Sequence, residues 1–397
     1  MKSAMRNPQS EVGGQPLRVL VVASLFPHAK NETIGLSTLR RTVELAKRCE
    51  VKVVALTGRR DLPEREAMGG VEVLRPRWRR IPKLGVFLDG YRYAARLAAV
   101  ARELRAAFEF DLLDAHWLYP DGFAAVRAGR RFGRPVAVTG RGSDVNDFCF
   151  HWAVGPFARS VLRGADRLFA VSRQLRDRMV EAGAPPERVS VVPNGVDTNL
   201  FRPGERDAAR CALGLPLHQR VLLSVGPMLP AKGFQHLIAG LALLDGGETP
   251  HLYIAGPGDY QRALERQAER LGLASRVKFL GRVAQGQMPL WYQAADLFCF
   301  GSLREGCPNV VLEALACGTP VVSTNVGGIP DLVEEGFSGL LFEPGSPEAF
   351  AEALKAALAR PWDRAAIAAA GARRSWAKVA EEYLTVFQHM VPSRGAT

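Results

Sequence analysis

The chain has 397 residues, enough for about two or three domains, and its hydrophobic share of 47% is that of a globular protein, which excludes a disordered or fibrous one. No apolar run approaches the roughly 18 residues of a membrane span, and the first segment, MKSAMRNPQSEVGGQ, lacks the apolar core of a secretory signal. The net charge of +12 lies entirely in residues 1–200, with 33 Lys and Arg against 21 Asp and Glu, which favours an anionic partner for that half.

The first half alternates short apolar runs with helical patterns. Helices are predicted at residues 38–48 and 91–108, and strands at residues 16–27, 51–57, 111–118, 134–142 and 166–172. Such alternation is typical of a parallel sheet with helices on its faces.

The segment VSVVPNGVDTNLFRPGER, residues 189–206, begins as a strand and continues into Asn-Gly, Pro and Gly turn signals. The alternation then restarts, with strands predicted at residues 220–226, 251–256, 276–281, 296–302, 319–325 and 339–344. We therefore expect an α/β protein with two doubly wound domains, residues 16–200 and 201–374, facing each other across a cleft. Residues 375–397 are predicted to hold one amphipathic closing helix.

Six cysteines occur without a C-x-x-C pair, and no His/Cys cluster or HExxH motif has the spacing of a metal site. We interpret the cysteines as reduced thiols of a cytosolic protein. The sequence therefore predicts no metal and no cofactor.

The stretch REGCPNVVLEALACG carries two acids around a predicted helix start. Pro308 suits a first helical turn and Gly318 a helix end, so the amides of Cys307 to Val310 form an anion site. Glu305 and Glu313 would be repelled by a phosphate, but each can accept from two neighbouring hydroxyls. A diphosphate flanked by two diols is a nucleotide sugar; alternatively, the acids only complement the helix dipole or are solvated.

The stretch EGCPNVVLEALACGTPVVSTNVGGIPDLV resembles the signature region of family 4 glycosyltransferases, also called glycosyl transferases group 1. The similarity extends through PNGVDTNLFRP, SVGPMLPAKGF, IAGPGDY, RVKFLGRV and MPLWYQAADLF, and covers nearly all of the second half. The segments DAHWLYPDG and VTGRGSDVN resemble a subgroup that builds bacterial envelope polysaccharides.

The resemblance implies the GT-B fold of two Rossmann-like domains, a nucleotide-sugar donor, retention of anomeric configuration and no metal. It implies that Glu305 contacts hydroxyls of the donor sugar, that Glu313 contacts the ribose, and that the final helix crosses back onto the first domain. The loop expected to hold the diphosphate or sugar consists of Gly306, Cys307, Pro308, Asn309 and Val310, and all of these except the proline offer a backbone N–H.

Lys232, in a loop before a helix, can reach a diphosphate as a point charge, although a lone loop lysine is usually solvated. Many relatives have an Arg where this chain has Pro227, which has neither a cation nor an N–H. Arg304 or Arg282 could replace it, or each could be a surface ion-pair partner.

His116 ends a predicted strand, where the family places a His near the reaction centre; the alternative is a hydrogen-bonded structural residue. Arg141 and Asp144 follow the next strand and are expected to line the acceptor side, although Asp144 could simply cap a helix. Many relatives have a Gly-Gly pair after the first strand, where only Gly35 offers bare backbone here.

The basic stretch RPRWRRIPK, residues 75–83, precedes an apolar-rich segment and mixes cations with Trp. Such a stretch suits an anionic membrane surface, where a lipid-linked acceptor would be found, but basic stretches are often merely solvated.

We therefore predict a retaining, metal-independent hexosyltransferase of the cytoplasm, peripheral at the inner face of the membrane. Its partners would be a nucleotide sugar and a lipid-linked or polysaccharide acceptor for bacterial envelope polysaccharide synthesis. The alternatives are a non-catalytic protein that binds nucleotide sugars or nucleic acid, for which no motif appears, and another GT-B enzyme such as a sugar-nucleotide epimerase or a phosphorylase.

Overall fold

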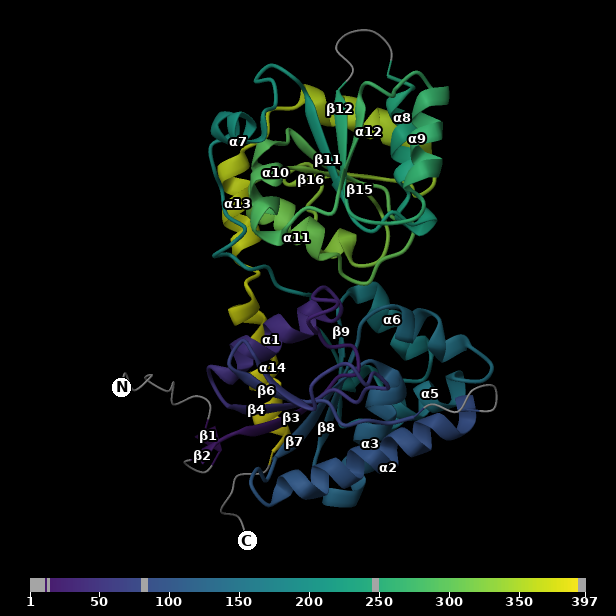
Figure 1. Cartoon of the computed structure of the whole chain (residues 1–397), viewed down its shortest axis with the longest axis vertical. Coiled ribbons are helices and arrows are strands. Elements are labelled where there is room, and N and C mark those ends of the chain that lie inside the picture. Colours follow the sequence, from purple (N-terminus) through teal and green to yellow (C-terminus); the bar gives the residue numbers. More distant parts are fainter. Residues whose placement is uncertain (1–10, 13–14, 80–84, 245–249, 392–397) are drawn as a thin grey trace. The chain divides into compact units, whose positions relative to one another are not determined.

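The computed structural model describes residues 11–12, 15–79, 85–244 and 250–391 (Figure 1). The chain divides into two compact units: the first consists of Met1–Asn194 with Trp376–Thr397, and the second of Gly195–Ser375. The boundary precedes the expected position at residue 200 because the connecting segment packs within the second unit. There the Val196 amide donates to the Arg374 carbonyl at 2.9 Å, and the ring of Phe201 lies 5.9 Å from that of Tyr292.

The first unit contains an eight-stranded sheet whose neighbours are all parallel except the last pair. Its strands are β3 (Arg18–Val22), β4 (Glu50–Val54), β5 (Arg65–Met68), β6 (Val71–Leu74), β7 (Leu112–His116), β8 (Val136–Gly140), β9 (Arg167–Ala170) and β10 (Val189–Val191). The order is β10-β9-β8-β7-β3-β4-β6-β5. A separate pair, β1 (Glu11–Val12) and β2 (Gln15–Pro16), is antiparallel.

The second unit contains a six-stranded sheet in which all neighbours are parallel. Its strands are β11 (Val221–Val225), β12 (His251–Ala255), β13 (Val277–Gly281), β14 (Leu297–Phe300), β15 (Val321–Thr324) and β16 (Gly339–Phe342), in the order β13-β12-β11-β14-β15-β16. The strands β14 and β15 are buried throughout, as expected of continuous apolar runs covered on both faces.

Helices cover the sheets of both units (Figure 1). Those of the first unit are α1 (Leu36–Ala46), α2 (Gly85–Arg105), α3 (Phe123–Phe132), α4 (Ser143–Asn146), α5 (Gly155–Gly164), α6 (Arg173–Glu181) and α14 (Trp376–Met390). Those of the second unit are α7 (Arg206–Leu213), α8 (Phe234–Leu241), α9 (Gln261–Arg270), α10 (Met288–Ala294), α11 (Asn309–Ala316), α12 (Pro347–Ala359) and α13 (Arg364–Ala372).

The two sheets share the same reversal of strand order. Each has a central pair, β3 with β7 and β11 with β14, from which the connections run outward in opposite directions. Such a switch point lies at the carboxyl ends of the strands and is where open α/β sheets bind ligands. Two parallel-sheet α/β units therefore confirm the expected fold class.

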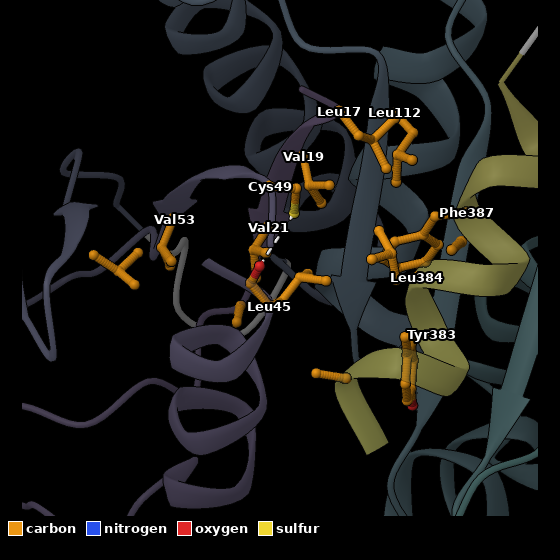
Figure 2. Close-up of a cluster of buried hydrophobic side chains, with 14 of the residues drawn as sticks. Leu17, Val19, Val21, Leu45, Cys49, Val53, Leu112, Tyr383, Leu384 and Phe387 are labelled. Atoms are coloured by element: carbon orange, nitrogen blue, oxygen red, sulfur yellow. Dashed lines mark hydrogen bonds between the residues drawn. The ribbon is translucent and has the colours of Figure 1, made fainter. Parts of the chain in front are cut away.

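The closing helix α14 packs into the first unit (Figure 2). Its buried residues recur at helical spacing and form one apolar face: Trp376, Val379, Ala380, Tyr383, Leu384 and Phe387. Figure 2 shows Leu384 and Phe387 on this helix near Leu112 of β7. Tyr383 and Val19 belong to the same hydrophobic cluster. Strand β3 and helix α14, which are far apart in sequence, thus share one hydrophobic core.

Two features near β6 differ from the sequence interpretation. The hairpin of β5 and β6 was not predicted, because its alternating pattern is short and interrupted by charged residues. Arg75 was counted with an exposed basic stretch, yet it is 2% exposed and binds Glu66 and the carbonyl of Pro27. Residues 80–84 of that stretch lie outside the described residues. None of the helices in the described part of the chain combines the length and apolar character needed to cross a membrane.

Candidate functional site

Lys232 and Glu305 meet at the switch point of the second unit. Lys232 ends a short 3-10 turn, Pro230–Lys232, which follows β11, and Glu305 lies in the loop after β14. The Lys232 Nζ lies 2.5 Å from the Glu305 Oε1, and the two side chains are 23% and 12% exposed. Two residues predicted to be catalytic, through contacts with the donor, are therefore paired, and both remain partly accessible.

The backbone explains why these loops approach each other. The Leu303 amide donates to the Ala231 carbonyl at 2.9 Å. Gly233 has a φ of 69°, and a Cβ there would stand 1.8 Å from the carbonyl oxygen of Gly301. Since only glycine fits this close approach, the Lys-Gly pair after β11 brings the lysine against the end of β14.

The segment from Gly306 to Val310 leads into α11 as expected. Pro308 is the residue before the helix, with φ −74° and ψ 117°, and Asn309 is the first helical residue. Pro308 thus lies one position earlier than a first-turn proline. The loop is held from the side by Gly327, where a Cβ would stand 2.1 Å from the Glu305 carbonyl oxygen.

Glu313 lies in the middle of α11 and is held by a buried tyrosine. The Tyr292 hydroxyl donates to the Glu313 Oε2 at 2.9 Å. Burial, reinforced by the nearby charge of Glu313, raises the pKa of Tyr292 well above its ordinary value. The tyrosine therefore stays protonated as a donor and orients the carboxylate predicted to bind the ribose.

The two arginines proposed to replace the missing phosphate contact differ in position. Arg304 is exposed and adjoins Glu305 in the loop after β14. Arg282 is also exposed, but it follows β13, which is the edge strand and is separated from β11 by β12. Two strand spacings correspond to roughly 10 Å, so the strand order favours Arg304 over Arg282.

In the first unit, His116 ends β7 and lies in a buried polar cluster. Its Nε2 is 2.6 Å from the Arg41 Nη2, its Nδ1 is 2.8 Å from the Arg141 Nη2, and the ring is 1% exposed. Arg41 also binds Asp114, which lies two residues before His116 on the same strand. The structural alternative for His116 thus has direct support, and a catalytic role stays a prediction.

Electrostatics keep this cluster in defined charge states. Burial and the charge of Arg41 lower the pKa of His116 to about 3. Burial is the largest single influence and would raise the pKa of Asp114, but Arg41 and His116 together, through charge and hydrogen bonds, lower it to about 2. Near neutral pH the histidine is therefore neutral and the aspartate is charged.

The closing helix completes the cluster. The Arg41 guanidinium lies 4.3 Å from the centre of the Tyr383 ring, and the Tyr383 hydroxyl lies 3.2 Å from the Thr139 Oγ1. Arg141 also donates to the Asn194 Oδ1 at 2.9 Å. Sequence reasoning missed Arg41, Asp114 and Tyr383. Of these three residues, only Asp114 could have been expected from the sequence, because it lies two residues before His116 and therefore on the same face of the predicted strand.

Asp144, placed on the acceptor side by the sequence analysis, is 0% exposed. Its carboxylate accepts from the backbone amides of Arg141, Gly142 and Leu118 at 2.9, 2.9 and 3.1 Å. This geometry favours a structural role, in which Asp144 joins the loops after β7 and β8. The side chain closer in space to His116 is Arg141.

Gly35 does not present open backbone. Its φ is 64°, and a Cβ there would stand 2.0 Å from the carbonyl oxygen of Leu25, so the chain itself fills the space. The loop after β3 is also held by a buried acid that the sequence analysis missed. Asp121 accepts from the Ser24 amide at 2.9 Å, the Ser24 hydroxyl at 2.6 Å and the Tyr93 hydroxyl at 2.5 Å.

Among the residues that the structure describes, no group of three or more His, Cys, Asp or Glu side chains could hold a metal ion. The expected independence from metals stays a prediction.

Comparison with known families matches both halves of the chain. Residues 205–374 match the family described as Glycosyl transferases group 1, and residues 36–200 match Glycosyltransferase Family 4. A D-inositol 3-phosphate glycosyltransferase of Segniliparus rotundus is 36% identical over 250 residues, which are 57% of this chain and 54% of that protein. The chain spans only 54% to 59% of the length of the first such relatives.

Solved structures share the fold at low sequence identity. Sucrose-phosphate synthase from Thermosynechococcus elongatus has a TM-score of 0.78 at 20% identity, covering 94% of this chain and 99% of that one. Anabaena HepE in complex with UDP has a TM-score of 0.76 at 23% identity, covering 94% and 100%. At such identities the likeness shows the fold alone.

Proposed function

Because the chain belongs to the family 4 glycosyltransferases of the GT-B fold, we propose that it transfers a hexose from a nucleotide-diphosphate sugar with retention of anomeric configuration and without a metal. The observation that carries this proposal is the Lys232–Glu305 pair at the switch point of the second unit, beside the start of α11. A cation, a carboxylate and a helix N-terminus suit a diphosphate next to a hydroxylated sugar.

The residues around this pair take distinct roles in the proposal. Lys232 neutralises the diphosphate together with the backbone N–H groups of Gly306, Cys307, Asn309 and Val310, since Pro308 has none. Glu305 accepts from hydroxyls of the sugar. Glu313, oriented by Tyr292, accepts from the ribose hydroxyls. Arg304 supplies the cation that Pro227 cannot, since it lies in the same loop as Glu305.

The transfer itself is a front-face substitution. The bond between the anomeric carbon and the diphosphate oxygen breaks, and its electron pair leaves with the diphosphate. The acceptor oxygen attacks the same face of the oxocarbenium-like sugar and gives its proton to a diphosphate oxygen. Lys232 and the helix amides stabilise the charge that develops on the leaving group, which is the largest contribution a protein makes to such a step.

Two acceptor classes compete. The segments DAHWLYPDG and VTGRGSDVN support a lipid-linked or polysaccharide acceptor of envelope synthesis at the inner face of the membrane. The names of the sequence relatives support inositol phosphate as an acceptor instead. Of the predicted acceptor-side residues, we assign Arg141 rather than Asp144, because the carboxylate of Asp144 is occupied by backbone amides.

The test begins with thermal unfolding in the presence of UDP, GDP and ADP, with UDP first because the fold relative HepE was solved with it. The matched sugar nucleotides are then incubated with each acceptor class, and NMR of the product reports the anomeric configuration. Inversion of configuration would contradict the proposed mechanism. Nucleotide binding without transfer to any acceptor class would favour the non-catalytic alternative.

A further inference from the structure

We propose that a hollow between α2 and the segment after β6 binds a phosphate-bearing ligand. The hollow has a volume of about 420 Å³, within the range of small-molecule sites. Its lining consists of Arg77, Trp78, Arg79, Arg92 and Arg96, and we call it the arginine hollow. It lies wholly in the first unit, and the proposal does not depend on sugar transfer.

The walls of the arginine hollow are held in place by the fold. The Trp78 amide donates to the Thr57 carbonyl at 3.1 Å, which ties this segment to the one after β4. The Trp78 ring packs edge-on against the buried Tyr93 of α2, with ring centres 5.1 Å apart. Arg96 donates from Nε to the Arg77 carbonyl at 3.3 Å. The concavity is therefore preformed rather than assembled around a ligand.

The charged side chains given for the lining of the arginine hollow are all positive. Arg92 and Arg96 are exposed, four residues apart on one face of α2, where like charges destabilise a helix. No acidic side chain is among the described residues that line the hollow. Glu64 does contact Arg77 at 3.5 Å, but these side chains are 72% and 44% exposed, and such a pair is weak. A bound anion would offset the repulsion.

The chemistry of the lining favours phosphate over a single carboxylate. Guanidinium groups form paired hydrogen bonds with either anion, but a phosphate monoester or diphosphate carries about two negative charges or more. Trp78 adds an apolar surface for the part of the ligand that bears the phosphate. This chemistry is shared by soluble phosphate compounds and by phospholipid headgroups.

The test is site-resolved protection of arginines in the full chain. Phenylglyoxal modifies accessible arginines, and mass spectrometry of peptides reports each position. Inorganic pyrophosphate at about ten times its dissociation constant is expected to slow modification of Arg92 and Arg96 about tenfold. The reference is Arg266 and Arg270, which are likewise exposed and four apart on α9. Because the readout is local, pyrophosphate bound in the second unit does not disturb it.

A second arm distinguishes the two sources of phosphate. Vesicles of equimolar phosphatidylglycerol and phosphatidylcholine replace pyrophosphate, with pure phosphatidylcholine as the control. Protection by pyrophosphate supports a soluble ligand, and protection by the anionic vesicles alone supports a headgroup. No protection by either, or equal protection of the α9 arginines, would overturn the proposal.

A variant provides independent confirmation. Arg92→Gln/Arg96→Gln removes two charges from the arginine hollow, and Arg266→Gln/Arg270→Gln removes the same charge from α9. Only the first is expected to lose the protection of Arg77 and Arg79, the remaining arginines of the hollow, by whichever probe protected the wild type. A cooperative thermal unfolding transition in both variants shows that both are folded. Equal loss in both variants would also overturn the proposal.

Discussion

The Lys232 Nζ lies 2.5 Å from the Glu305 Oε1, although 73 positions separate the two residues in the chain. Each follows one of the two central strands of the second sheet, and the reversal of strand order brings the loops together. In the proposed function, the donor places its diphosphate and sugar at this pair. Binding of a donor would therefore have to break the ion pair between Lys232 and Glu305. Substitution of either residue should then change donor binding or turnover.

Replacing Lys232 with Met should weaken nucleotide-diphosphate binding. The loss of one charge-assisted hydrogen bond corresponds to about 1.5–3 kcal/mol, or roughly ten- to a hundredfold in affinity. Titration calorimetry with the nucleotide identified by thermal unfolding measures the effect. Lys355→Met on α12, an exposed lysine of the same unit, is the control and should bind as the wild type does. Equal affinity in Lys232→Met would remove this residue from the donor site.

The two glutamates should separate binding from turnover. Glu305→Gln is expected to keep nucleotide-dependent stabilisation but to lower kcat about a hundredfold, because the sugar loses its orienting carboxylate in the transition state. Glu313→Gln is expected to lose most of the stabilisation by nucleotide. Thermal unfolding and steady-state kinetics with one verified donor distinguish them. If both variants behaved as the wild type, the assignment of the pair would be wrong.

Acid should destabilise the first unit through His116. Its pKa of about 3 in the folded chain lies below the ordinary value of 6.5, so the unfolded chain takes up a proton that the folded chain refuses. The stabilisation is complete above pH 6.5 and is lost as pH falls toward 3, at up to about 1.4 kcal/mol per pH unit. Urea unfolding across this window should show a smaller slope for His116→Gln, and an unchanged slope would contradict the prediction.

Asp121 should have the opposite effect on stability, so that acid favours the folded chain. Burial raises its pKa from 3.8 to about 6, despite the hydrogen bonds from Ser24 and Tyr93 that lower it. Between these two pH values the folded chain keeps a proton that the unfolded chain releases. The free energy of unfolding is therefore highest below pH 3.8 and decreases as the pH rises through 6. Asp121→Asn keeps an oxygen acceptor without the titration. Its unfolding free energy relative to the wild type should therefore increase from pH 4 to pH 7, by about 1–3 kcal/mol.

Removal of metals should leave turnover unchanged. The proposed mechanism neutralises the diphosphate with Lys232 and helix amides instead of a divalent cation. The measurement is product formation after dialysis against EDTA, compared with the same enzyme supplemented with magnesium or manganese. A loss of activity that either metal restores would contradict the metal-independent mechanism.

Much of the architecture was predictable because it depends on local pattern. Each predicted strand from 16–27 to 339–344 was confirmed, since a strand buried on both faces requires a continuous apolar run. The helix start at Asn309 followed from Pro308 and the apolar residues after it. The short β5–β6 hairpin was missed, because β5 is partly exposed and the mostly buried β6 is only four residues long with a Glu inside it.

The site was predictable only in part. Glu305, Glu313 and Lys232 were predicted from spacing and resemblance, and their site roles stay predictions. The partners that the structure gives them, such as Tyr292 for Glu313, were not predicted. Arg41 looks like any solvated arginine on an amphipathic helix, yet it is 1% exposed and binds Asp114 and His116. Similarly, the carboxylate of Asp144 is occupied by three backbone amides, a fact invisible in the sequence.

The sequence by itself determined the alternation of helices and strands, the two α/β halves and the helix start that suits an anion, because these follow from periodicity and turn chemistry within a few residues. The tertiary structure decided which loops meet and which charges are buried. These properties depend on strand order and on the packing of distant segments, such as α14 against α1, where Tyr383 contacts Arg41.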